Sequence, residues 1–209
     1  MYIKLFLMIR PRPLQKRSQK RLERFLGAAK EELNERGYSD LSISRISARA
    51  GVKPTSVYRY LHNKTAVLEM LMDEFEDGIS AQMKARIIEK PSLEVFISYF
   101  LSDLQFYCSQ ENWIMQAQIG MRVELEMQAY HEEAIDRLAD IVRIGLSNYC
   151  RFESKEGGLR VGKSIVLIIE TFLMALGRNI LLGLTNKGLR ADFEELILSQ
   201  IMHLRIDSE

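Results

Sequence analysis

Residues 42–61, SISRISARAGVKPTSVYRYL, decide the fold of this chain. The spacing of their apolar residues predicts two short amphipathic helices that meet at Gly51. Ser42 is expected to cap the first helix, and Pro54 stands at the first position of the second, where a missing N–H costs nothing. Two short helices joined by a tight glycine turn have the pattern of a helix-turn-helix.

The second helix of this pair has one apolar side and one polar side. At 100° per residue, Val57 and Leu61 define the buried side. The opposite side and its flanks carry short polar residues, one arginine and two tyrosines: Thr55, Ser56, Arg59, Tyr58 and Tyr60. Arginine can bind guanine edges, and hydroxyl groups can bind phosphates, so this side suits the major groove of DNA. An ordinary helical hairpin with a polar face has the same periodicity.

Helical patterns continue on both sides of the motif. One helix is expected to end at Arg36, before Gly37, and another to begin after Asn63 and carry Phe75, Ile79 and Met83. Further helices are expected at about 92–108, 111–121, 124–150, 159–184 and 190–205, separated by turns at 109–112, 156–158 and 186–188. No alternating apolar and polar run is long enough for a sheet. The sequence predicts an all-α protein with about nine helices.

Charge divides the chain into two parts. Residues 1–64 hold 15 Lys and Arg against five Asp and Glu, whereas residues 65–209 hold 14 against 23. A basic block on an acidic body is typical of a module that binds a polyanion, although a solvated basic face is the alternative. We expect a flexible basic arm at 1–17, a DNA-binding domain at 18–64 and a helical domain for effector binding and dimerisation at 65–209.

The stretch from Leu41 to Leu68 resembles the DNA-binding signature of TetR-type transcriptional repressors. The resemblance is carried by Ile46, Ala50-Gly51-Val52, Val57-Tyr58, Tyr60-Leu61, Lys64 and Leu68. It implies DNA contacts at Ser42, Lys53, Thr55, Ser56, Tyr58, Arg59, Tyr60 and Lys64. In the family's pattern a small capping residue is usual at position 53, a polar or basic residue at 54 and phenylalanine at 61. Lys53, Pro54 and Leu61 depart from it, which leaves the exact start of the recognition helix open.

The larger C-terminal part is expected to bind a small apolar or aromatic effector within residues 79–180. Aromatic and sulfur-containing side chains concentrate there, and such stripes usually form core. The candidate pocket residues are Phe106, Trp113, Met115, Met121, Tyr130 and Phe172. Glu170 interrupts an apolar helix, either as a pocket acid or as an interface or rim carboxylate, and we favour the second interpretation.

Dimerisation is expected through the last two helices. Residues 161–184 are apolar nearly all round, and a small monomer cannot hide such a surface. The face expected at the dimer interface consists of Phe193, Leu196, Ile197, Ile201 and Leu204.

Other classes of site and location lack support in the sequence. Cys108 and Cys150 form no metal or redox motif, and the three histidines lack metal-ligand spacing, with His131 expected on a polar helix surface. Residues 165–184 are long enough to span a bilayer, but they contain charged residues, so a buried helix is favoured. The apolar start lacks a cleavage site, and either Met1 or Met8 is the natural first residue. A cytoplasmic protein without metal or cofactor is expected.

These patterns predict a dimeric, ligand-responsive transcriptional repressor that binds a palindromic operator and is released by a small apolar or aromatic effector. An architectural DNA-binding protein without an effector and a helical enzyme are the alternatives. An enzyme needs converging acid–base or metal groups, which the sequence does not offer at recognisable spacing.

Overall fold

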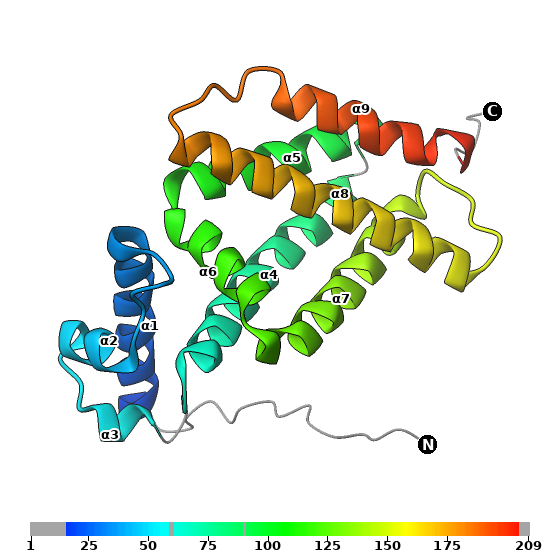
Figure 1. The fold of residues 1–209 in the computed structure, drawn as a ribbon. Coiled ribbons are helices and arrows are strands. Elements are labelled where there is room, and N and C mark those ends of the chain that lie inside the picture. Colours follow the sequence, from blue (N-terminus) through cyan, green and yellow to red (C-terminus); the bar gives the residue numbers. More distant parts are fainter. Residues whose placement is uncertain (1–15, 59–60, 90, 205–209) are drawn as a thin grey trace.

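The structure, a computed structural model, describes residues 16–58, 61–89 and 91–204. Within these ranges it is all-α, as the sequence predicts, with nine α-helices and no strand (Figure 1). The helices are α1 (Lys16–Arg36), α2 (Ile43–Ala50), α3 (Pro54–Val57), α4 (Lys64–Glu89), α5 (Leu93–Gln110), α6 (Asn112–Val123), α7 (Gln128–Leu146), α8 (Lys155–Leu181) and α9 (Leu189–Ile201). Short 3₁₀ turns follow α6 (Leu125–Met127) and α9 (Met202–Leu204). Most of the expected basic arm, residues 1–15, lies outside the described residues.

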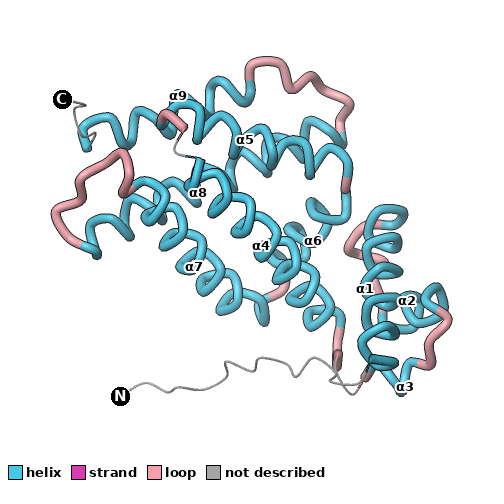
Figure 2. The backbone as a smooth tube through the Cα atoms, turned by 180° about the vertical axis from the view of Figure 1, so that it is seen from behind, coloured by secondary structure: helices cyan, strands magenta, loops and turns pink. Residues whose placement is uncertain are grey.

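Helices α1–α3 form a small group at one side of the molecule, and α4 runs from this group into a larger body built from α5–α9 (Figures 1 and 2). In the body, α7 and α8 pack along each other, and α9 lies over α8 and α5. Helix α6 contacts α1 as well as α4 and α8. The small group and the body therefore meet along both α4 and α6.

The core is one continuous cluster of buried apolar side chains rather than two separate cores. Phe25, Leu33 and Ile46 fill the space between α1 and α2, and Leu68 continues the cluster along α4. Phe172 on α8 is fully buried in the body. The N-terminal helices and the body therefore share one close-packed core.

The predicted break at residues 156–158 is wrong, because α8 begins at Lys155 and contains both glycines. Ser154 caps the helix, with its hydroxyl accepting a hydrogen bond of 3.0 Å from the Gly157 N–H. A Cβ at Gly158 would lie 2.9 Å from Cγ of Arg143 on α7. Glycine therefore serves close packing of α7 and α8 here, not a turn. The expected helix 124–150 is also shorter, because a 3₁₀ turn precedes α7 and α7 ends at Leu146.

Among the described residues, no helix is both long enough and apolar enough to cross a membrane. The apolar helix predicted at 165–184 is instead part of α8, whose inward side chains pack into the body.

Candidate nucleic-acid interface and effector cavity

Local capping shapes the helix-turn-helix as the sequence predicts. The Ser42 hydroxyl accepts a hydrogen bond from the Arg45 N–H at 3.4 Å at the start of α2. Gly51 ends α2 with a φ of 61°, a left-handed conformation that glycine adopts without strain. Pro54 occupies the first turn of α3, and Asn63 caps α4 through a hydrogen bond of 2.9 Å from the Ala66 N–H. Ser42 and Asn63 thus define where α2 and α4 begin, and Gly51 and Pro54 lie at the turn between α2 and α3.

Electrostatic contacts fix α2 against α1. Arg49 donates hydrogen bonds to three carboxylates of α1, among them Glu32 at 2.6 Å and Glu31 at 3.2 Å, and Glu35 completes the group. Its hydrogen bonds with Glu35, Glu32 and Glu31 raise the pKa of Arg49. Arg24 donates to the carbonyl of Ala50 at 2.5 Å. Arg49 is thus occupied within the domain and is not free to bind DNA.

Helix α3 and the residues described beside it agree with the predicted apolar and polar sides. Val57 and Leu61 are buried, whereas Thr55 is exposed and Tyr58 is 44% exposed. Ser56 is half-buried.

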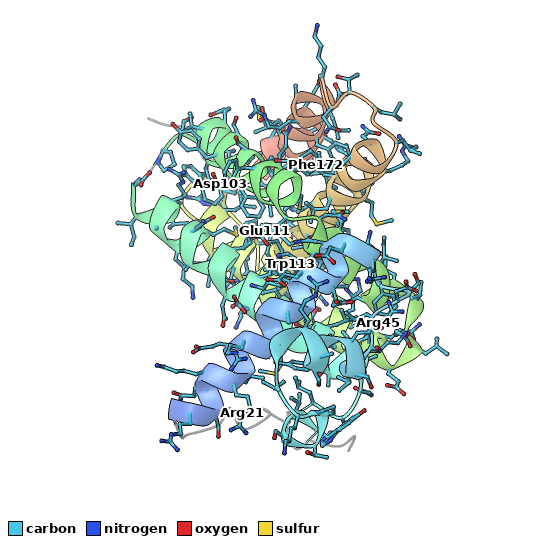
Figure 3. The ribbon with its side chains drawn as sticks, turned by 90° about the vertical axis from the view of Figure 1, so that its left-hand side faces the viewer. Arg21, Arg45, Asp103, Glu111, Trp113 and Phe172 are labelled. Carbon is cyan, nitrogen blue, oxygen red and sulfur yellow. The ribbon has the colours of Figure 1, made fainter. Side chains whose placement is uncertain are left out.

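Lys53 precedes α3 and is exposed. Of the predicted base and phosphate contacts, Arg59 and Tyr60 lie outside the described residues. Figure 3 shows Arg21 on α1 and Arg45 on α2 at the same end of the molecule, away from Phe172 in the body.

Lys64 is already engaged in the structure. Its ammonium group lies 2.8 Å from the Glu124 carboxylate and 4.3 Å from the centre of the Tyr38 ring. The Tyr38 hydroxyl donates to the same carboxylate. The hydrogen bond with Glu124 raises the pKa of Lys64, and the hydrogen bond with Lys64 lowers the pKa of Glu124. Burial raises the pKa of Tyr38 to about 12.

This junction of Tyr38, Lys64 and Glu124 connects the N-terminal helices to the residue that ends α6. The sequence does not point to Tyr38 or Glu124, because no local pattern shows that residues so far apart in the chain lie beside each other. The predicted phosphate contact of Lys64 competes with Glu124 for the same ammonium group.

The body contains a cavity of about 60 Å³, lined by residues of α4 to α8. Phe75, Ile79 and Met83 of α4 line it, as their helical spacing predicts. Most of the remaining wall consists of aliphatic and methionine side chains. Its polar groups are Glu76, Gln118, His131 and Glu170.

Two pairs of charged or titratable groups occur at the cavity. Nε2 of His131 lies 3.3 Å from Oε1 of Glu170, and both side chains are largely buried. Glu76 accepts a hydrogen bond of 2.9 Å from Arg137, and burial raises the pKa of Glu76. The expectation that His131 lies on a polar helix surface is therefore wrong, because this residue of α7 lines the cavity and contacts Glu170 of α8. Glu170 also lines the cavity, with its side chain 20% exposed.

The predicted pocket residues occupy different environments, and only Met121 lines this cavity. Phe106 is 61% exposed, because its position on α5 points to solvent. Met115 is buried, with its methyl group where a Cβ on Gly177 would be.

The other three pocket candidates are packed against neighbouring helices. Trp113 is buried at the contact of α6 with α1, and Lys30 lies 4.8 Å from the centre of its ring. Tyr130 donates a hydrogen bond of 2.9 Å to Asp73 on α4. Phe172 is fully buried, with its ring centre 5.3 Å from that of Phe193.

The face predicted for dimerisation lies largely inside the protomer. Ile197 and Ile201 are buried, and Phe193 packs on Phe172. The carbonyl of Leu204 accepts a hydrogen bond of 2.8 Å from the Arg151 N–H. Of the five residues, Leu196 is the one whose side chain is exposed. Their placement follows from the packing of α9 over α5 and α8.

Exposed apolar side chains instead follow α8. Leu167 and Met174 are 51% and 43% exposed, and they are one heptad apart on the same side of the helix. In the described part of the chain, no three histidine, cysteine or carboxylate side chains are grouped so that they could hold a metal ion.

Comparisons with known proteins agree with this geometry. Residues 25–71 match the family described as bacterial regulatory proteins, tetR family. No curated protein sequence gives a significant match.

Three solved structures have the same fold. A TetR-family transcriptional regulator from Streptomyces coelicolor shares 20% identity, with a TM-score of 0.68 over 88% of this chain and 99% of that one. A TetR transcription regulator from Haloarcula marismortui shares 16%, with a TM-score of 0.67 over 90% and 99%. FadR of Thermus thermophilus, a TetR-family repressor solved with lauroyl-CoA, shares 18%, with a TM-score of 0.61 over 90% and 96%.

The helix-turn-helix carries the family's sequence pattern, and the fold of regulators in that family extends through the body. Residues 25–71 thus match the DNA-binding domain of the tetR family of bacterial regulatory proteins, and the chain as a whole has the fold of transcription regulators of that family.

Proposed function

We propose that this protein is a homodimeric repressor that releases a palindromic operator when a small molecule occupies the cavity. The observation that carries the proposal is the position of α6. This helix separates the cavity from the DNA-binding helices and contacts both. We also propose the division into residues 18–64 for DNA binding and residues 65–209 for effector binding and dimerisation.

One face of α6 holds the end of α1. The N–H of Trp113 donates to the Asn34 side chain at 2.5 Å, and Gln116 accepts from the Tyr38 N–H at 3.0 Å. Glu124 continues this face with its contacts to Tyr38 and Lys64. Positions 113, 116, 120 and 124 recur at helical spacing, so they form one stripe.

The other side of α6 carries Gln118 and Met121, which line the cavity. Helix α4 makes a second connection, because it begins at Lys64 and lines the same cavity about two to five turns later, from Met72 to Met83. A ligand that displaces either helix therefore changes the orientation of the recognition helix. Such coupling is typically worth about 1–3 kcal/mol and is reciprocal between the two ligands.

The proposed DNA contacts are those of the recognition helix and its flanks. Ser42, Lys53, Thr55, Ser56 and Tyr58 lie on or beside α2 and α3 in the structure. Arg59 and Tyr60 complete the proposed set from outside the described residues, and Lys64 joins it once Glu124 releases it. Each phosphate neutralised contributes about 0.9 to the slope of log affinity against log salt.

The proposed dimer uses the exposed side of α8 together with Leu196 of α9. Pairing two copies through these helices would place two recognition helices about 34–36 Å apart, one turn of DNA. Replacing Leu167 and Met174 together with glutamate is expected to give a monomer in light scattering at micromolar concentration. The matched control replaces Ile88 and Leu125 with glutamate, since each is 79% exposed elsewhere on the molecule. This control is expected to leave the mass of the dimer unchanged. Equal masses for the two double variants would contradict the proposed interface.

Selection of genomic DNA fragments by the purified protein, followed by sequencing, tests the function. The expected result is a short palindrome whose binding weakens steeply with salt. Candidate effectors are then added to the complex, and those that bind the protein should release the operator by the same factor by which the operator weakens their binding. Absence of any preferred sequence would contradict the repressor, and an effector that binds without releasing DNA would contradict the switch.

A further inference from the structure

The cavity has a chemistry that restricts its ligand. Its wall is apolar over most of its area, and three methionines, Met72, Met83 and Met121, line it from α4 and α6. A volume of about 60 Å³ has room for a few water molecules. Methionine side chains are flexible and polarisable, so the wall can adapt to a larger apolar body. The ligand therefore needs an apolar body that moves these side chains.

One carboxylate at the wall is available to such a ligand. Glu170 lies on α8 beside Val166, Ile169 and Leu173, which line the cavity with it. Its hydrogen-bonding or ionic partner among the described residues is His131 alone, at 3.3 Å. A carboxylate has two oxygens and can accept about four hydrogen bonds, so one contact leaves most of its capacity unused.

The second carboxylate is neutralised within the protein. Glu76 is paired with Arg137 at 2.9 Å. Tyr130 donates to Asp73, an exposed acid on α4. Neither Glu76 nor Asp73 adds positive charge to the cavity.

The net charge at the cavity wall is zero or negative in either state of His131. In the described part of the chain, no lysine or arginine lines the cavity. If His131 is neutral, the charge of Glu170 is uncompensated, and if it is protonated, the two groups cancel. An anionic ligand would therefore be desolvated beside the Glu170 carboxylate, with no cation at the wall beyond the one that His131 can supply and that Glu170 already pairs with, which is costly. A cationic ligand would exchange its hydrating water for a direct contact with the Glu170 carboxylate.

We infer that the effector is a lipophilic amine, with its ammonium group on Glu170 and its apolar body between α4, α6 and α8. This inference rests on the proposed function, since it names the ligand class of the proposed effector site. It distinguishes this cavity from a site for a fatty acid or another organic anion.

The test compares three probes with the same chain: n-octylammonium, n-octanol and n-octanoate, added to the full-length protein at pH 8. Trp113, the single tryptophan of the chain, reports binding, because its ring lies 6.4 Å from that of Phe75, which lines the cavity. Octylammonium is expected to bind about tenfold more tightly than octanol, a difference of about 1.4 kcal/mol, and octanoate more weakly than both.

Glu170→Gln is expected to remove the preference for the amine while octanol binding stays within twofold. Glu132→Gln, an exposed site on α7, is the matched control and should leave all three affinities unchanged. His131→Gln supplies a second variant should Glu170→Gln fail to fold, and it should retain or strengthen amine binding. Tighter binding of octanoate, an unchanged preference in Glu170→Gln, loss of amine binding in His131→Gln, or no binding of any probe overturns the inference.

Operator release separates this inference from the proposed function. If octylammonium binds through Glu170 but leaves the operator complex intact, the ligand class stands and the switch fails. If octanol or octanoate releases the operator and octylammonium does not bind, the switch stands and the ligand class fails.

Discussion

The crossing of α7 and α8 gives a prediction whose sign follows directly from the geometry. Gly162 on α8 is buried against α7, and a Cβ there would lie 2.3 Å from the carbonyl oxygen of Ala139 and 3.0 Å from its carbonyl carbon. These are backbone atoms, so no rotation of a side chain can relieve the overlap. Gly162→Ala must separate the two helices that hold His131 and Glu170.

The expected cost comes from two opposing effects. Overpacking of a tightly packed core typically costs about 1–3 kcal/mol. Alanine is a better helix former than glycine, so the substitution also stabilises the helix by about 0.5–1 kcal/mol. The difference between the two effects spans about 0–2.5 kcal/mol, and because the overlap is with backbone atoms we expect Gly162→Ala to lower the free energy of unfolding by about 1–2 kcal/mol.

Gly78→Ala is the matched control. Gly78 lies within α4, is exposed, and has no atom within 4 Å of the position of a Cβ. The same substitution there should raise the free energy of unfolding by about 0.5–1 kcal/mol. Urea denaturation followed by circular dichroism, at one fixed protein concentration, measures both variants. Equal or higher stability of Gly162→Ala relative to Gly78→Ala would refute the close-packing argument.

Three further predictions concern DNA binding and the core. If Arg59 binds a base, Arg59→Ala should weaken operator binding by about 1–3 kcal/mol and relax the sequence preference at one position per half-site. Gel-shift titrations on variant operators measure both effects, and an unchanged affinity contradicts any DNA contact of Arg59. Glu124→Gln should strengthen operator binding a few-fold by freeing Lys64, an effect that should vanish in the Lys64→Ala background. Burial raises the pKa of Cys108 to about 12, so its thiolate is scarce at pH 8, and iodoacetamide should label it only after unfolding, as mass spectrometry can establish.

The local features of the DNA-binding helices were predictable from the sequence because each depends on neighbours in the chain. Ser42 and Asn63 cap helices through residues three positions away, and Gly51 adopts its left-handed turn at the end of α2. The position of Val57 inside and Thr55 outside follows from helical spacing alone. The caps and the turn of a contiguous motif can be predicted because the residues that form them are close together in the sequence.

Long-range packing decided the features that the sequence analysis missed. The glycines at 157 and 158 have the composition of a turn, but the cap from Ser154 and the close approach of Arg143 make them part of α8. The type of residue also does not distinguish the side chains that line the cavity from those that pack in the core or face solvent. Phe106 points to solvent and Phe172 packs on Phe193, although both are large and aromatic.

By itself, the sequence determined the all-α class, the helix-turn-helix and the resemblance of residues 25–71 to the tetR family, because these depend on the residues within short stretches. Only the tertiary structure decided which side chains line the cavity, that Glu170 meets His131 there, and that Lys64 is held by Glu124. It also decided that Ile197 is buried within the protomer rather than left for a partner. The physical reason is common to all of these: each depends on how separate helices are rotated and packed against one another, and helical periodicity specifies a buried face but not the helix that covers it.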